Sequence, residues 1–131
     1  MIFKLLKYST LLFFGLTRNN FYTIRDNRNL KGLVSVHHII PKQFKNHPVI
    51  KISNYDIENG YNLMFLPTNN AYNKLLLHHD RPFHSNGHNK YNKYVEDILD
   101  EMFMMGKINE YNLCELNKKL KQNMRHLDCP W

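Results

Sequence analysis

Two adjacent histidines lie inside the clearest strand pattern of the sequence. Residues 33–40 are rich in leucine, valine and isoleucine, and Pro41 ends the run, so the pattern predicts a strand. His37 and His38 fall near the end of that strand. Because successive side chains of a strand point to opposite faces, one imidazole there can bind a metal while its neighbour faces a substrate.

A second strand is predicted over residues 61–66, which are mostly apolar and precede Pro67. Residues 41–60, between the two strands, are punctuated by Pro, Asn, Ser and Gly, so we expect a long functional loop there. Strand, loop and strand together indicate a wide antiparallel hairpin. Residues 17–30 are polar and rich in Asn, and we expect them to form a connecting loop.

Helical patterns follow the second strand. Residues 68–79 predict a short helix that begins at Thr68 or Asn69. Residues 89–105 carry apolar side chains at the spacing of an amphipathic helix, and Gly106 stands where a C-terminal cap belongs. The apolar positions of this helix are Tyr91, Tyr94, Val95, Ile98, Leu99 and Met102.

A last amphipathic helix is predicted near the C-terminus. Its apolar face carries Leu113, Leu116, Leu120, Met124 and Leu127. Its basic residues, at other positions, are Lys118, Lys119, Lys121 and Arg125. We expect the basic residues to form a solvated face, and the alternative is a face that contacts phosphates.

The N-terminal residues 1–16 contain a short apolar run that follows Lys4 and Lys7. Positive charge before an apolar run is typical of a signal peptide. Since no clean cleavage site follows, we favour a helix that docks on the domain. The run is too short to span a bilayer, so we expect no stable membrane insertion.

The charge of the chain indicates its partner. Lys and Arg number 18 against 11 Asp and Glu, which gives a net charge of +7 and a pI near 9.4. A basic domain of 131 residues attracts polyanions, nucleic acid first and anionic membranes second. The eight histidines occur in clusters, which indicates metal binding or acid–base chemistry.

These residue types suit the hydrolysis of a phosphodiester bond. A histidine can take a proton from the attacking water near neutral pH. A divalent cation can offset the negative charge that builds up on the phosphate. His84 and His88 are four residues apart, a spacing that places two ligands on one side of a helical turn.

Three motifs follow one another within residues 36–91. They are Val36-His37-His38-Ile39-Ile40-Pro41, then Asn62 ahead of Leu66-Pro67, then His84-Ser85-Asn86-Gly87-His88-Asn89-Lys90-Tyr91. In this order they resemble the AHH nucleases of the HNH/endonuclease VII (His-Me finger) superfamily. Val36 stands where the family usually has Ala, Gly87 is shifted by one residue within its motif, and Asn59-Gly60 is an alternative match for the central Asn.

The resemblance implies a metal-dependent endonuclease with an α+β fold. It implies a ββα-metal core with an N-terminal extension and C-terminal helices. His38 is the implied general base, and Asn62 is implied to hold the His38 region in place across the long loop. The implied ligands of one divalent metal ion (Mg²⁺, Mn²⁺, Ni²⁺ or Zn²⁺) are His37, His84 and His88.

The organisation and partners follow from these expectations. We expect an N-terminal extension at residues 1–30, the nuclease core at 31–105 and a basic C-terminal helix at 106–131. The expected partner is nucleic acid, with DNA ahead of RNA. The lysines expected to contact it are Lys42, Lys90 and Lys93.

Several alternatives stay open. If residues 68–79 form the metal-site helix, then Asn69, Asn73 or His78 would replace His84. The other rival ligands are the pair His78-His79, Asp56 and Asp80, whereas we expect His47 and His126 on the surface. The alternative function is an inactive, metal-containing module that binds nucleic acid. A third hypothesis is a toxin domain with an immunity protein. The sequence leaves the location open between the cytoplasm and that of a delivered or secreted effector.

Overall fold

The computed structural model describes residues 16–75, 89–126 and 129–131. Strands β1 (Val34–His38) and β2 (Leu63–Pro67) pair antiparallel. The helices are α2 (Arg18–Asn27), α3 (Pro48–Ile52), α4 (Asn69–Leu75), α5 (Asn89–Met104) and α6 (Glu110–Arg125), with 3-10 turns η2 (Lys42–Asn46) and η3 (Gly60–Asn62). The predicted α+β class and the antiparallel strand pair are confirmed.

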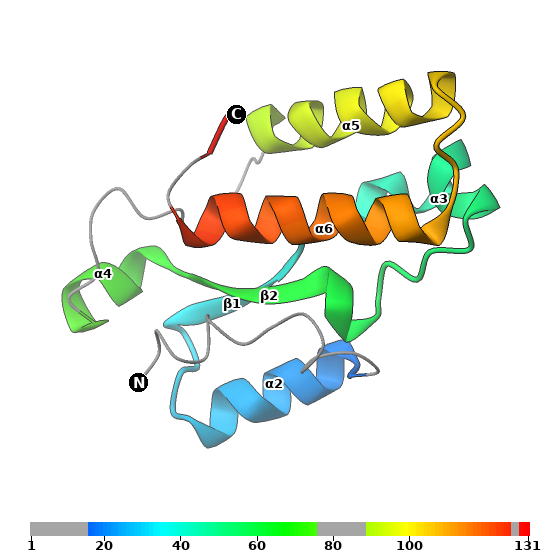
Figure 1. The fold of residues 1–131 in the computed structure, drawn as a ribbon. Helices are drawn as coiled ribbons and strands as arrows, with labels where there is room; N and C mark the ends of the chain where they lie inside the picture. Colours follow the sequence, from blue (N-terminus) through cyan, green and yellow to red (C-terminus); the bar gives the residue numbers. More distant parts are fainter. Residues whose placement is uncertain (1–15, 76–88, 127–128) are drawn as a thin grey trace.

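The sheet forms a middle layer between helices. In Figure 1, α2 lies below the two strands, and α5 and α6 lie above them. A small core between α2 and the sheet contains Val34 and Val36 together with Phe21, which is fully buried. The larger core on the other side combines residues of α3, α5 and α6 with the segment after β1.

The strand register assigns the two histidines to opposite layers. His38 is opposite Leu63, on the face of Val36 that packs toward α2. His37 is opposite Met64, whose side chain belongs to the core under α5 and α6. The alternation of the strand therefore directs one imidazole into each layer.

The polar segment 17–30 was expected to be a loop, and this prediction is wrong. It forms α2, which begins with a capping box. Thr17 Oγ1 accepts a hydrogen bond from the Asn20 backbone N at 3.4 Å, and Asn20 Oδ1 accepts one from the Thr17 backbone N at 2.8 Å. These bonds satisfy backbone donors that a helix start otherwise leaves without partners. The ring of Phe21 anchors the helix to the sheet, with its centroid 5.1 Å from that of Phe65.

The segment 41–60 is more regular than the expected long loop. It contains η2 and α3, and its apolar side chains Phe44, Val49, Ile50, Tyr55 and Ile57 are buried in the larger core. His47, expected on the surface, has only 12% of its side chain exposed. Its Nδ1 caps α3, and its Nε2 lies 2.8 Å from Asp100 Oδ1 of α5. That expectation was wrong because the histidine joins two helices.

The two C-terminal helices agree with their predicted patterns. Gly106 has a φ of +69°, the left-handed conformation of a C-terminal cap. The prediction of a solvated basic face on α6 is correct for Lys118 and Lys119. It is wrong for Lys121, which is 1% exposed. Lys121 Nζ donates a hydrogen bond to the Tyr61 carbonyl, and burial lowers the pKa of Lys121 to about 7.

The expected N-terminal helix lies almost wholly outside the described residues. In the described part of the chain, none of the helices combines the length and the apolar composition that a membrane-spanning helix needs. The larger core joins residues from Ile39 to Met124, so it includes α6 as well as the segment after β1.

Candidate active site

His38 lies at the end of β1 in a chain of polar contacts. With 12% of its side chain exposed, its Nε2 lies 3.2 Å from Glu58 Oε2. Lys42 Nζ lies 2.9 Å from the other carboxylate oxygen of Glu58. Burial raises the pKa of Glu58, but hydrogen bonds from Lys42 and His38 outweigh it and hold that pKa below its ordinary value. Glu58 is therefore a carboxylate at neutral pH, with one cationic neighbour and one imidazole neighbour.

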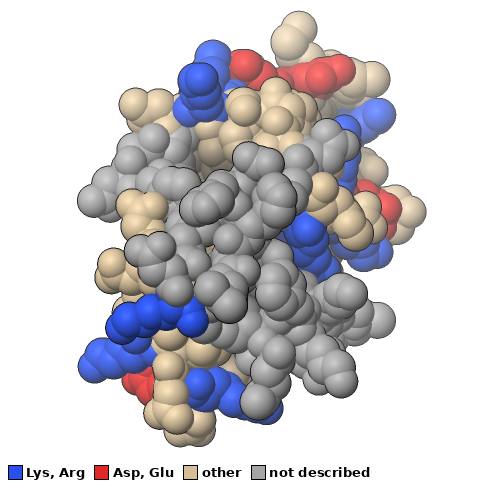
Figure 2. Space-filling view, turned by 90° about the vertical axis from the view of Figure 1, so that its left-hand side faces the viewer, with Lys and Arg blue, Asp and Glu red and all other residues tan. Residues whose placement is uncertain are grey.

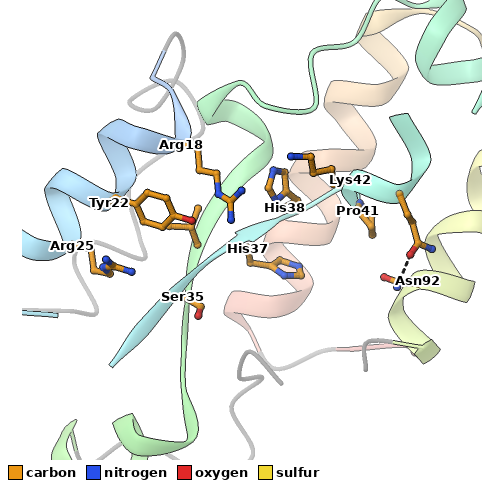
Figure 3. Close-up of a pocket in the computed structure, with 11 residues that line it drawn as sticks. Arg18, Tyr22, Arg25, Ser35, His37, His38, Pro41, Lys42 and Asn92 are labelled. Atoms are coloured by element: carbon orange, nitrogen blue, oxygen red, sulfur yellow. Dashed lines mark hydrogen bonds between the residues drawn. The ribbon is translucent and has the colours of Figure 1, made fainter. Parts of the chain in front are cut away.

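A cleft of about 440 Å³ opens beside β1. Its walls come from α2, from β1, from residues 41–43 and from Asn92 of α5 (Figure 3). His37 and His38 both border it, and three cationic side chains, Arg18, Arg25 and Lys42, line it. No acidic side chain lines the cleft among the residues that the structure describes, so it is suited to an anion.

His37 occupies the α5 side of the sheet. Its side chain is buried, with 6% exposed, and its ring centroid is 5.4 Å from that of Tyr91. The Tyr91 hydroxyl donates a hydrogen bond to the Ile39 carbonyl, just beyond β1. Burial raises the pKa of Tyr91 well above its ordinary value, so the hydroxyl keeps its proton. These contacts fix the first turn of α5 against the strand that carries the histidine pair.

Asn62 forms the centre of a buried hydrogen-bond network. Its side chain is 0% exposed. Its Oδ1 accepts from the Ile40 backbone N at 2.9 Å, and its Nδ2 donates to the carbonyls of Ile40 at 3.1 Å and Ile57 at 2.9 Å. Tyr55 and Asn117 also donate to Oδ1, each at 3.0 Å. The residue thus joins the segment after β1 to the far end of the 41–60 segment.

Asn59, the alternative match for the central Asn of the motif, lies at the start of η3. Its side chain accepts a hydrogen bond from the Tyr61 backbone N at 3.3 Å and caps η3. The hydrogen bonds that cross the 41–60 segment to Ile40 come from Asn62.

The other candidate ligands are only partly described. His84, His88, His78, His79 and Asp80 lie outside the described residues, as does the Asn73 side chain. Asn69 is exposed at the start of α4, and Asp56 is exposed, with its Oδ1 accepting from the Glu58 backbone N at 3.0 Å. Within the described ranges, no three His, Cys, Asp or Glu side chains form a group that could hold a metal ion.

The three lysines expected to contact nucleic acid separate in space. Lys42 lines the cleft. Lys90 and Lys93 are exposed on α5 and are not among the lining residues, and Lys93 Nζ lies 2.7 Å from Asp97 Oδ1. That hydrogen bond raises the pKa of Lys93, and the ion pair with Asp97 offsets the positive charge of the lysine within α5.

The sequence pattern missed Glu58 and the α2 residues that line the cleft. Glu58 is 20 positions from His38, and no spacing rule connects them. The capping box at Thr17 and Asn20 was the available signal for α2. Once α2 is recognised, Arg18, Tyr22 and Arg25 follow at helical spacings of three and four, which place them on one face.

The positive charge extends beyond the cleft. On the face drawn in Figure 2, Lys and Arg side chains lie in separate groups, with fewer acidic side chains beside them. Some of these groups lie at the lower end, at the height of α2 in Figure 1. The positive charge on this face is therefore spread over several places.

Comparison with known proteins identifies the family. Residues 24–126 match the family model AHH, described as a nuclease family of the HNH/ENDO VII superfamily with conserved AHH. Because the match covers most of the chain, the protein belongs to this family. Comparison with curated proteins and with solved structures finds no match.

Proposed function

We propose that this AHH-family nuclease is a metal-dependent endonuclease that cleaves DNA, with RNA as the alternative substrate, in the cleft beside β1. The observation that carries the proposal is the His38–Glu58 pair. It combines an imidazole with a carboxylate partner at the edge of a cationic cleft, within the family's histidine motif.

His38 is the proposed general base. When its Nε2–H donates to Glu58, its Nδ1 carries the lone pair that can accept a proton from water. The Glu58 carboxylate favours this tautomer and stabilises the imidazolium that forms, as a third group does for the base of other hydrolases. Glu58 is a positioning residue in this proposal, because it acts through His38.

Lys42 and the cleft arginines supply positive charge where the phosphate would lie. Positive charge fixed in place before the reaction stabilises negative charge that develops on a phosphate in the transition state. Lys42 shares its charge with Glu58, so its contribution to an incoming phosphate would be smaller than that of an unpaired lysine.

The proposed metal ligands are His37, His84 and His88. His37 presents a buried imidazole against Tyr91, in the first turn of α5, and His88 immediately precedes that helix in the sequence. A set of imidazole donors suits Ni²⁺ and Zn²⁺ by affinity better than Mg²⁺ or Mn²⁺. When bound, the metal ion would offset negative charge on the phosphate and the leaving oxygen. On this proposal β1, β2 and the start of α5 form the ββα-metal core.

Asn62 is proposed to keep this geometry in place. Its bonds to Ile40 hold the backbone two residues after His38, and Ile57, next to Glu58, is held by the same side chain. A single buried amide therefore fixes both chain segments that carry the base and its carboxylate partner.

Supercoiled plasmid and a labelled RNA, each incubated with purified protein, would test the proposal. The protein is first treated with EDTA and then supplied with Mg²⁺, Mn²⁺, Ni²⁺ or Zn²⁺ separately. We expect cleavage that needs added metal and that prefers DNA. Binding of either nucleic acid without cleavage under every metal would favour the inactive binding module instead.

A further inference from the structure

Helix α2 gathers two guanidinium groups around one aromatic ring. The Arg18 Cζ atom lies 5.3 Å from the centroid of the Tyr22 ring, and the Arg25 Cζ atom lies 4.9 Å from it. Cation–π contacts of this kind hold an arginine without neutralising it. Arg25 also pairs with the exposed Asp26, whose Oδ1 is 2.8 Å from Nε.

Arg18 is incompletely satisfied in this arrangement. Its Nε is buried and has no hydrogen-bond partner within the part of the chain that the structure describes. A buried charged donor without an acceptor is costly, and such groups normally meet a ligand, water or a carboxylate. Figure 3 shows the Arg18 side chain reaching from α2 toward β1, between Tyr22 and His38. An anion in the cleft would supply the missing acceptor.

Arg18 and Arg25 share a cleft with His38, and this arrangement indicates which phosphate of a nucleic acid they would contact. They line the same cleft as His38 and lie on the same side of the sheet, because α2 covers the face to which His38 points. A nucleic-acid strand carries a phosphate at every nucleotide, so a strand cut beside His38 presents its next phosphate to the neighbouring wall of the cleft. Guanidinium groups suit that role because their fork of donors matches phosphate oxygens.

We infer that Arg18 and Arg25, held by Tyr22, bind the phosphate adjacent to the scissile one on the strand that is cut. This inference rests on the proposed function. The family match begins at residue 24, so Arg18 and Tyr22 lie before the matched residues. Arg25 lies within the match, so the proposed subsite spans its start.

Binding in the presence of EDTA tests the subsite without requiring cleavage. Fluorescence anisotropy with a labelled DNA oligonucleotide is measured over a series of salt concentrations for wild type, Arg18→Gln and Arg28→Gln. Arg28 is the matched control, since it is an exposed arginine at the end of the same helix and does not line the cleft. We expect Arg18→Gln to weaken binding about tenfold and to reduce the salt slope by about one. Arg28→Gln should change both values much less.

Cleavage then distinguishes the adjacent phosphate from the scissile one. The small diester bis(p-nitrophenyl) phosphate has a single phosphate, so it cannot occupy both positions. We expect kcat/KM for Arg18→Gln to fall further on DNA than on this diester. Arg18→Lys, which keeps the charge but loses the donor fork, should lie between wild type and Arg18→Gln on DNA.

The outcomes separate this inference from the proposed function. Weaker binding by Arg18→Gln in EDTA supports the subsite even if the wild-type protein cuts nothing. Equal losses for Arg18→Gln and Arg28→Gln would show general electrostatic attraction and overturn the inference. Equal losses on DNA and on the small diester would place Arg18 at the scissile phosphate and overturn it as well.

Discussion

Replacing Asn62 by alanine removes the side chain that joins the segment after β1 to the end of the 41–60 segment. Three backbone groups lose a buried partner: the N–H and carbonyl of Ile40 and the carbonyl of Ile57. Tyr55 and Asn117 keep their own hydrogen bond of 3.0 Å. Each orphaned buried group costs about 1–3 kcal/mol, and water entering the vacated space reduces that cost. We therefore expect Asn62→Ala to lower the free energy of unfolding by about 3–5 kcal/mol.

Urea unfolding followed by far-UV circular dichroism measures this loss. Asn46→Ala is the matched control, because Asn46 is exposed in η2, and it should change stability by less than about 0.5 kcal/mol. Asn62→Leu separates lost hydrogen bonds from lost volume, since leucine fills a similar space without polar atoms. A loss below about 1 kcal/mol for both Asn62 variants would refute the proposed role of the network.

Three further changes test other parts of the structure. Because burial lowers the pKa of Lys121 to about 7, the unfolded chain holds a proton that the folded chain lacks above that pH. The free energy of unfolding, measured with urea, should thus rise by up to about 1.4 kcal/mol per pH unit between about pH 7 and about pH 9. Lys121→Met should flatten this rise. Glu58→Gln should reduce the nicking rate by about ten- to a hundredfold, by analogy with groups that orient metal-binding histidines. A rate equal to that of the control Glu115→Gln would exclude an orienting role. Thr17→Ala removes the capping box and should lower the free energy of unfolding by about 1 kcal/mol, and an unchanged urea midpoint would show that the cap contributes nothing.

Periodic burial made much of the fold predictable. Val34 and Val36, two residues apart, both pack toward α2, as the alternation of a strand requires, and the residues of α5 with the lowest exposure repeat at helical spacing. Gly106 was identified because a left-handed cap favours glycine. Such patterns depend on local geometry, so the sequence contains them in full.

The basic residues of α6 show how a local pattern can be misapplied. Leu113, Asn117 and Lys121 are spaced by four and lie on one buried stripe, yet the positive charge of Lys121 led to its assignment to the surface. The i, i+4 spacing was the signal that placed Lys121 inside. Helix α2 was missed for a related reason, since only Phe21 in it is buried and the rest of the helix resembles a polar loop in composition.

Contacts between distant segments account for the remaining differences. Glu58 meets His38 across 20 residues, and Asn117 meets Tyr55 across 62. Neither pairing follows from spacing or propensity, because each depends on how layers pack in three dimensions. The histidine motif could thus be found from sequence, whereas the carboxylate that contacts His38 required the structure. So did the packing of α2 on the face of β1 to which His38 points.

Plasmid nicking by wild type and His38→Ala, with and without EDTA and with added divalent metals, tests the central claim most directly. His126→Ala is the matched control, because His126 is exposed at the end of α6. We expect metal-dependent nicking by wild type and the control, a loss of at least about a hundredfold in His38→Ala, and nearly unchanged metal binding in that variant. Nicking by His38→Ala at the wild-type rate would contradict the assignment of His38 as the general base.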